Sequence, residues 1–184
     1  MRKYLKVLAY LSCFGFIIIN TVAFFHAYKF THFSNEQSSK TNNPAELSVF
    51  DKIEALVLGV NLPRPENEFL PKQQFETVSI KSNKEIEGWL ISNDRSIGTV
   101  IMFHGYGGKK STLLDKSDEF QKLGYRTFLI DFMGSGGSQG VQTTIGFYEA
   151  EQVKNCVEYL QSKGEKSIHL YGGSMGAVSI IKAI

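Results

Sequence analysis

The first hydrophobic pattern along the chain is a run without any charge, from Val7 to Phe25. A helix that crosses the hydrocarbon core of a membrane needs about 20 mostly apolar residues. More basic residues precede the run than follow it closely: Arg2, Lys3 and Lys6 against Lys29. We therefore expect residues 1–30 to form a single-pass transmembrane anchor, with a cytoplasmic N-terminus and an extracytoplasmic domain. A cleaved signal peptide, which would release a secreted protein, is the alternative.

The next two segments differ in their periodicity. Residues 31–44 are polar and show no periodic pattern, which predicts a linker. Residues 45–62 carry apolar side chains at helical spacing opposite charged ones, which predicts an amphipathic helix. An N-cap at Asn43 followed by Pro44 is typical of a helix start. We expect this helix to pack on the domain; a place on a membrane surface has less support, because its polar side is not rich in Lys or Arg.

From residue 74 to residue 184, short apolar runs alternate with amphipathic segments. Strands are expected over residues 74–80, 86–91, 99–103, 126–131 and 167–171, and helices over residues 111–123 and 147–163 and from residue 175. The resulting order is β-β-β-α-β-α-β-α. Strands that alternate with helices predict an α/β domain, with a mostly parallel sheet, flanking helices and right-handed crossovers.

Composition excludes several classes of protein. Hydrophobic residues make up 42% of the chain and charged residues 21%, which is ordinary for a globular protein. The two cysteines, Cys13 and Cys156, are too few for a disulfide framework. A net charge of +2 gives no basic stripe of the kind that binds nucleic acid. No cluster of Cys and His suggests a metal site, and we expect neither a metal nor an organic cofactor.

Two segments match the pattern G-x-S-x-G, at Gly172–Gly176 and Gly136–Gly140. In a nucleophile elbow the serine occupies a sharp turn directly between a strand and a helix. Ser174 has an expected strand immediately before it and an expected helix immediately after it, whereas Ser138 lies in a Gly/Ser loop. Ser174 is therefore the candidate nucleophile. A tight turn that caps a helix is the structural alternative, because motif matches of this kind arise by chance.

The segment HGYGG at residues 104–108 follows an expected strand and precedes an expected helix. Backbone N–H groups in such a loop can point at an oxyanion that develops during acyl transfer. Glycine-rich turns also bind phosphate. That reading has less support, because Lys110 stands where the third glycine of G-x-G-x-x-G belongs and the P-loop pattern is also broken.

Three motifs in this order make residues 74–184 resemble the first half of an α/β-hydrolase, in the broad serine aminopeptidase-like or lysophospholipase-like group. They are HGYGG at 104–108, DFMGSGGS at 131–138 and GGSMG at 172–176. The middle one is similar to the family's D-x-R-G-x-G-x-S loop, with Met133 where Arg is common. The resemblance implies that Ser174 is the nucleophile and that the backbone N–H groups of Met175 and Tyr106 form the oxyanion hole. It also implies a set of residues that shape the two loops: His104, Gly105, Gly172 and Gly176.

The partners that would activate the serine are not evident. In this fold the triad follows the chain order Ser, Asp or Glu, then His. The segment after Ser174, MGAVSIIKAI, contains none of these acids and no histidine. His104 lies in the oxyanion loop and His169 within a strand, so neither is expected to be the base. We therefore expect the chain to be truncated before the acid and the histidine, and to be inactive by itself.

These observations predict a membrane-anchored serine hydrolase that attacks the acyl carbonyl of an ester, a lipid or a peptide. Its expected partners are such a substrate and, through the N-terminal helix, a membrane. The alternative is a catalytically inactive truncated product or a non-catalytic binding module on the same scaffold, because a fold does not fix a function.

Overall fold

A computed structural model describes residues 2–35, 45, 47–94 and 96–184, and the chain divides into two compact units. The first unit comprises Met1–Pro63 and the second Arg64–Ile184. Most of the expected linker, residues 36–44, lies outside the described residues.

The first unit contains two helices, α1 (Arg2–Thr31) and α2 (Val49–Leu58). α1 has no buried residue, and its most apolar window has a mean hydropathy of 2.1. By length and composition it is the one helix of the described residues that could cross a membrane, and a signal sequence would pass the same test. The expected hydrophobic segment is therefore confirmed as a long apolar helix.

The start of α2 differs from the expected one. Ser48 is the N-cap: its hydroxyl oxygen accepts a hydrogen bond from the backbone N–H of Asp51, and its own N–H donates to the Asp51 carboxylate at 3.1 Å. This reciprocal pair satisfies two N–H groups that a helix end otherwise leaves without partners. Asn43 and Pro44, the expected start, lie outside the described residues. The helix spans residues 49–58 and not 45–62, because Ser48 begins it and Gly59, at φ +81°, ends it.

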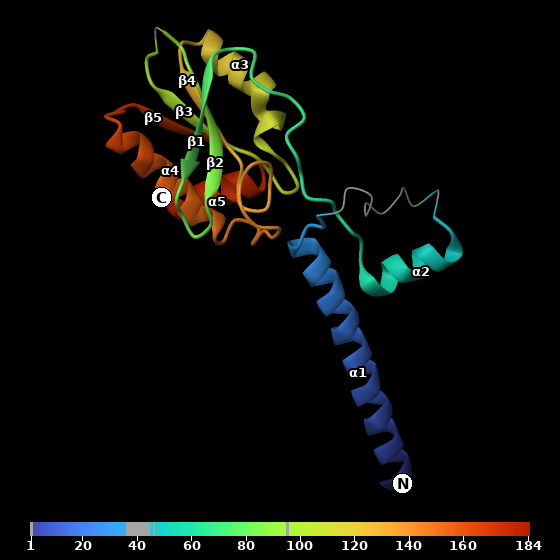
Figure 1. Cartoon of the computed structure of the whole chain (residues 1–184). Coiled ribbons are helices and arrows are strands. Elements are labelled where there is room, and N and C mark those ends of the chain that lie inside the picture. Colours follow the sequence, from blue (N-terminus) through green and yellow to red (C-terminus); the bar gives the residue numbers. More distant parts are fainter. Residues whose placement is uncertain (1, 36–44, 46, 95) are drawn as a thin grey trace. The chain divides into compact units, whose positions relative to one another are not determined.

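The second unit is built on a five-stranded mixed sheet with the order β1-β2-β4-β3-β5 (Figure 1). The strands are β1 (Phe75–Ile80), β2 (Ile86–Ile91), β3 (Thr99–Phe103), β4 (Arg126–Ile130) and β5 (Ile168–Gly172). β1 and β2 form an antiparallel pair, β2 is antiparallel to β4, and β3 is parallel to both β4 and β5. Every expected strand is present to within one residue at each end.

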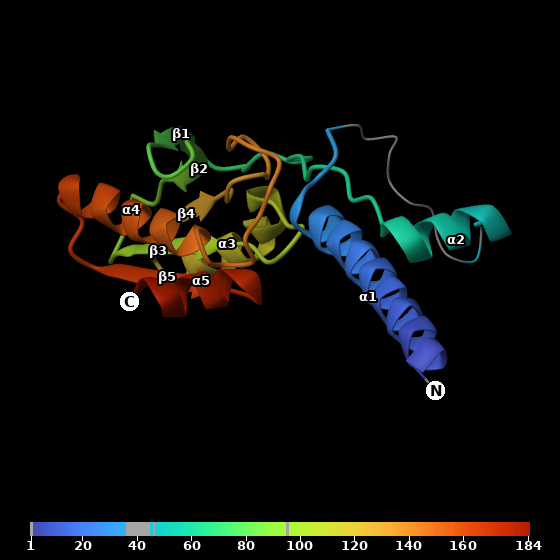
Figure 2. The same cartoon turned by 90° about the horizontal axis from the view of Figure 1, so that it is seen from below.

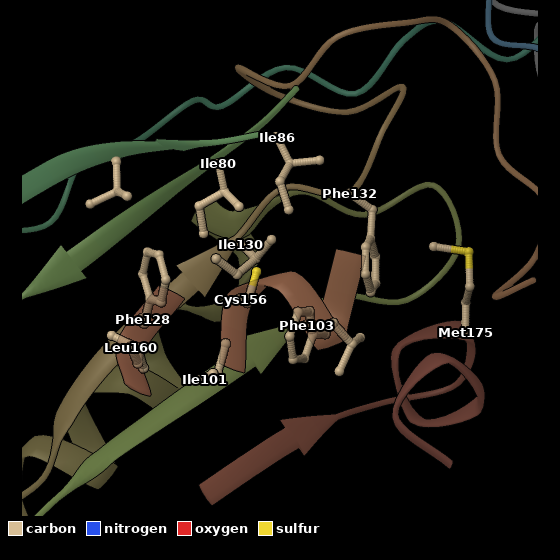
Figure 3. Packing of buried hydrophobic residues seen from close by; sticks show 12 residues of the cluster. Ile80, Ile86, Ile101, Phe103, Phe128, Ile130, Phe132, Cys156, Leu160 and Met175 are labelled. Carbon is tan, nitrogen blue, oxygen red and sulfur yellow. The ribbon is translucent and has the colours of Figure 1, made fainter. Parts of the chain in front are cut away.

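Helices cover both faces of this sheet. They are the short 3-10 helix η2 (Lys110–Leu113), α3 (Leu114–Lys122), α4 (Glu149–Ser162) and α5 (Met175–Ala183). One core joins α4 and α5 to one face of the sheet, with Cys156, Leu160 and Phe103 at its centre (Figure 3). The other core contains Trp89 and Met102, with α3 packed against it. The chain thus has the layered α/β architecture that the alternation of strands and helices predicts.

The strand order creates a switch point at β3. The chain passes from β3 to β4 on one side and then crosses to β5 on the other side of β3. In the register, Phe103 at the end of β3 pairs with Gly172 at the end of β5. Figure 2 shows α5 beginning where β5 ends. The loops after these two strands therefore start side by side, which is where open α/β sheets bind their ligands.

Candidate active site

Ser174 sits in a backbone conformation that L-amino acids seldom adopt. Its φ is 53° and its ψ is −119°, and among the described non-glycine residues only Ile145 also has a positive φ. Such a conformation costs of order 1–3 kcal/mol, and it persists where the surroundings impose it, as at active sites. Ser174 lies between the last residue of β5 and the first turn of α5, and its side chain is exposed. This is the strand–turn–helix geometry of a nucleophile elbow.

The glycines of the motif are needed because the backbone segments approach closely. A Cβ atom on Gly176 would lie 2.5 Å from the carbonyl oxygen of Phe103, and one on Gly172 would lie 2.7 Å from the carbonyl carbon of Gly176. Both distances are shorter than real Cβ contacts. Larger residues would therefore push the first turn of α5 away from β5 and from the end of β3. By contrast, a Cβ on Gly173 would meet nothing within 4 Å.

The loop after β3 lies beside Ser174. A Cβ atom on Gly105 would be 3.5 Å from the Cβ of Ser174 and 3.4 Å from the carbonyl oxygen of Gly173. Met175 is the first residue of α5, so its N–H has no partner within the helix. Tyr106 follows Gly105 directly and is half-buried. The two segments that carry the N–H groups of Met175 and Tyr106 therefore meet at the candidate nucleophile.

His104 is buried between the loop after β3 and the start of the loop after β4. Its Nε2 lies 3.1 Å from the backbone nitrogen of Phe132 and its Nδ1 lies 2.8 Å from the carbonyl oxygen of Gly105. The Phe132 N–H can only donate and the Gly105 oxygen can only accept, so the ring is neutral with its proton on Nδ1. Both ring nitrogens are thus occupied by backbone. The side chain holds the loop and has no nitrogen left to take a proton from Ser174.

Comparisons with known proteins agree with this arrangement. A family model described as "Serine aminopeptidase, S33" matches residues 94–184. The structure resembles that of the esterase Pf2001 from Pyrococcus furiosus, with a TM-score of 0.60 and 33% identity, over 66% of this chain and 50% of the esterase. This chain is a member of the α/β-hydrolase superfamily.

Two curated relatives are more distant. The uncharacterized protein YqkD of Bacillus subtilis is 29% identical over 99 residues, which cover 53% of this chain and 32% of YqkD. The uncharacterized protein YfhR of Escherichia coli K12 is 26% identical over 110 residues, which cover 56% of this chain and 39% of YfhR. This α/β-hydrolase chain therefore matches about half the length of the esterase and about a third of these curated relatives.

This α/β-hydrolase contains a buried ionic cluster that the sequence pattern did not predict. Lys110 is fully buried, and its ammonium donates to a carboxylate oxygen of Asp131 and, at 2.6 Å, to one of Glu87. The ammonium also lies 4.4 Å from the ring centroid of Trp89. The backbone N–H of Lys110 donates to the other Asp131 oxygen at 2.6 Å. Lys110 therefore ties the loop after β3 to the loop after β4 through both its backbone and its side chain.

Asp131 is ionised at the centre of this cluster. Burial by itself would raise the pKa of its carboxyl group, but the ammonium and the N–H of Lys110, with the Asn67 amide, hold that pKa below its ordinary value. The Gly137 N–H also donates to Asp131, at 2.9 Å. A Cβ on Gly136 would lie 1.8 Å from a carboxylate oxygen of Asp131. The glycines of the loop after β4 thus let the backbone wrap closely around the carboxylate.

Ser138, in the second G-x-S-x-G segment, is part of the same loop. Its side chain is buried, donates to the carbonyl oxygen of Asp131 at 2.6 Å and accepts from the Glu87 N–H at 2.8 Å. Both contacts are with backbone, so this hydroxyl bridges the β4 loop and β2. Ser138 therefore has a structural environment that differs from the exposed turn of Ser174.

A second buried carboxylate supports the elbow from the side of α4. Glu149 accepts hydrogen bonds from the hydroxyls of Thr143 and Thr144 and from the N–H of Gly146. Burial would raise the pKa of Glu149, but the hydrogen bonds from Thr143 and Thr144 hold it below its ordinary value. The Thr143 hydroxyl also lies 3.2 Å from the sulfur of Met175. Glu149 thus organises a loop that packs against the first residue of α5.

A pocket of this unit lies away from the elbow. A cavity of about 440 Å³ lies between residues 68–73 and the start of α3, and its lining includes Lys109 and Ser111 but neither Ser174 nor Tyr106. Among the described residues, no group of three or more His, Cys, Asp and Glu side chains is arranged to hold a metal ion.

His104 predicts a pH-dependent stability of the α/β-hydrolase unit. Burial lowers the pKa of its imidazole below the ordinary value of 6.5. Below pH 6.5 the His104 imidazole therefore binds a proton more readily in the unfolded chain than in the folded chain. The free energy of unfolding consequently falls as the pH drops below 6.5. The expected slope is up to about 1.4 kcal/mol per pH unit. Denaturant titrations between pH 7 and pH 5 measure it.

A His104→Gln variant is the control for this prediction, because it can still accept from Phe132 but does not titrate. The carboxyl groups whose pKa is lowered add their own loss of stability only at lower pH, as the pH falls below the ordinary values of 3.8 for Asp131 and 4.5 for Glu149 and Glu165. Equal slopes for the wild type and the variant above pH 5 would show that His104 is not the titrating group.

Proposed function

We propose that this chain carries the nucleophile and the oxyanion hole of a serine hydrolase that acts on the acyl carbonyl of an ester, a lipid or a peptide. The observation that carries the proposal is the positive φ of Ser174, a non-glycine residue, between β5 and α5. The approach of Gly105 to Ser174 adds the second element that acyl transfer needs, a loop whose N–H groups can face a developing oxyanion.

The proposed chemistry begins with attack by the Ser174 hydroxyl oxygen on the acyl carbonyl carbon. The carbonyl oxygen becomes an oxyanion, which the N–H groups of Met175 and Tyr106 would stabilise by donating hydrogen bonds. Loss of one such donor typically lowers kcat by about 100- to 1,000-fold. Collapse of the tetrahedral intermediate expels the alcohol or amine and leaves an acyl-enzyme, which water then hydrolyses.

A histidine and an acid are required to activate the serine. Within the described residues, His104 is bonded to Gly105 and Phe132, and His169 lies on β5 with its Nε2 3.3 Å from the hydroxyl of Ser167. Neither is hydrogen-bonded to Ser174. We therefore propose that the described residues of the second unit do not supply the activating pair, and we expect this unit alone to react slowly with acyl substrates.

Covalent labelling tests the nucleophile. In the protein as its source cells produce it, a fluorophosphonate probe should modify Ser174, because such probes react with activated serines. Trypsin cuts after Lys166 and Lys182, so mass spectrometry should find the label in the peptide of residues 167–182. A Ser174→Ala variant should lose labelling by at least about 1,000-fold, by analogy with the loss of a triad serine.

Ser167→Ala is the matched control, because Ser167 lies in the same peptide and is hydrogen-bonded to a histidine. It should label as strongly as the wild type. Labelling that survives in Ser174→Ala would place the nucleophile elsewhere. An unlabelled wild-type protein would favour the alternative, a non-catalytic binding module on this scaffold.

We also propose that α1 is an uncleaved membrane anchor with a cytoplasmic N-terminus, with the hydrolase unit on the other side of the membrane. Its support is an exposed apolar helix of 30 residues with the basic residues concentrated at its start. We expect the protein to stay in the membrane fraction after extraction with alkaline carbonate, and its mature N-terminus to precede Val7. A mature N-terminus after residue 25 would instead identify a signal peptide.

A further inference from the structure

Helix α2 carries an apolar stripe that no other described residue of the first unit covers. The stripe follows helical spacing along one side, and its side chains remain 42–84% exposed: Val49, Phe50, Ile53, Leu56 and Val57. Phe50 is the most exposed, at 84%. Isolated exposed apolar residues are normal on soluble proteins, but a continuous stripe of this kind marks an interaction surface.

The C-terminal end of α2 contacts α1. The carbonyl oxygen of Leu56 lies 2.8 Å from Nε2 of His26, and that of Gly59 accepts from the ammonium of Lys29 at 3.3 Å. Ala55 is half-buried and lies about 160° around the helix from the centre of the stripe, at 3.6 residues per turn. α1 therefore holds α2 by the carbonyl oxygens of its C-terminal end, and the side chains of the apolar stripe stay exposed.

The residues of α1 that hold α2 lie just after the uncharged run of the proposed membrane anchor. The uncharged run of α1 ends at Phe25, and His26 and Lys29, which hold α2, follow it at once. From Val7 to Phe25 a helix rises about 28 Å, which matches the hydrocarbon thickness of about 30 Å. A helix bonded to residues 26 and 29 thus lies where α1 leaves the hydrocarbon and enters the headgroup region.

We infer that α2 is an interfacial helix that lays its apolar stripe into the lipid leaflet from which α1 emerges. This inference rests on the membrane anchor in the proposed function. The stripe inserts at the boundary between the lipid headgroups and the acyl chains, as the apolar sides of interfacial helices do. The charged residues of α2 are Asp51, Lys52 and Glu54, which are not an excess of positive charge. The helix therefore binds zwitterionic lipid and does not require anionic lipid.

Tryptophan quenching in vesicles tests this placement. The full chain is reconstituted in phosphatidylcholine vesicles whose acyl chains are brominated close to the headgroup. Phe50→Trp places a reporter in the stripe, and Lys52→Trp places one beside it on the polar side of the same helix. The native Trp89, which is buried in the other unit, gives the same background in both variants.

We expect quenching at position 50 to exceed that at position 52 by about twofold, because the apolar side of an interfacial helix lies about 5–10 Å deep. Adding anionic lipid should not change the ratio. Ile53→Trp, in the same stripe, repeats the measurement if Phe50→Trp fails to fold.

The possible results distinguish the placement of α2 in the leaflet from the anchoring of α1, on which that placement rests. Equal quenching at positions 50 and 52, in a chain that resists carbonate extraction, would overturn the inference and leave the anchor in place. A chain that carbonate releases from the vesicles would overturn both. A ratio that appears only with anionic lipid would overturn the zwitterionic preference and assign the contact to charge.

Discussion

Replacing Lys110 by Met should destabilise the hydrolase unit by about 3–5 kcal/mol, because it leaves the buried carboxylate of Asp131 without its cation. Lys110 is fully buried, and its ammonium contacts the carboxylates of both Asp131 and Glu87. Met has a similar length but no charge. Denaturant unfolding can be followed through the emission of Trp89, the only tryptophan of the chain, whose ring lies against the Lys110 ammonium.

The neighbouring Lys109 offers a matched control. Its ammonium pairs with Glu68, whose side chain is 65% exposed, so Lys109→Met should cost no more than about 1 kcal/mol. Similar losses in the two variants would mean that the cluster around Asp131 contributes no more than a surface ion pair. A loss in Lys110→Met that disappears when Asp131 is also changed to Asn would confirm that the unpaired carboxylate is the cause.

Replacing Gly176 by Ala should destabilise the unit by about 1–3 kcal/mol and lower the rate of probe labelling at Ser174 by about 100-fold. The new methyl group would lie 2.5 Å from the carbonyl oxygen of Phe103, which is backbone and cannot rotate away. Overpacking of this kind forces the backbone to shift. A displacement of about 1 Å in an active site can lower the rate by about 100-fold. Denaturant unfolding and labelling rates measure the two effects.

Gly173→Ala is the control for stability, since a Cβ there would meet no atom within 4 Å. It should change the free energy of unfolding by less than about 0.5 kcal/mol. If Gly176→Ala were equally neutral, the close approach of α5 to β3 would not be what restricts this position to glycine.

The strands were predictable because their burial leaves a simple pattern. β3 and β4 are covered by helices on both faces, so the sequences TVIMF and RTFLI are almost continuously apolar. The strand–turn–helix junction at Ser174 was also predictable, because an apolar strand precedes this serine and an apolar helix follows it directly, whereas Ser138 has neither.

The cluster around Lys110 was not predictable in the same way. Lysine is rarely buried, and nothing around residue 110 departs from the pattern of an exposed helix start. Its partners come from β2 and from the loop after β4, so only the folded sheet brings the three charges together. The expected start of α2 was wrong for a different reason. The sequence analysis considered only Asn43 and Pro44, whereas the reciprocal Ser48–Asp51 pair begins the described helix.

The buried thiol of Cys156 is an internal reporter of local unfolding in this protein. The side chain lies at the centre of the core beneath α4 (Figure 3), and burial raises the pKa of its thiol well above the ordinary value. Because only the thiolate reacts, a thiol reagent should modify Cys156 only when α4 separates from the sheet. In a Cys13→Ser background, the rate of that modification would report how often α4 separates from the sheet. No reporter group would have to be introduced into the unit.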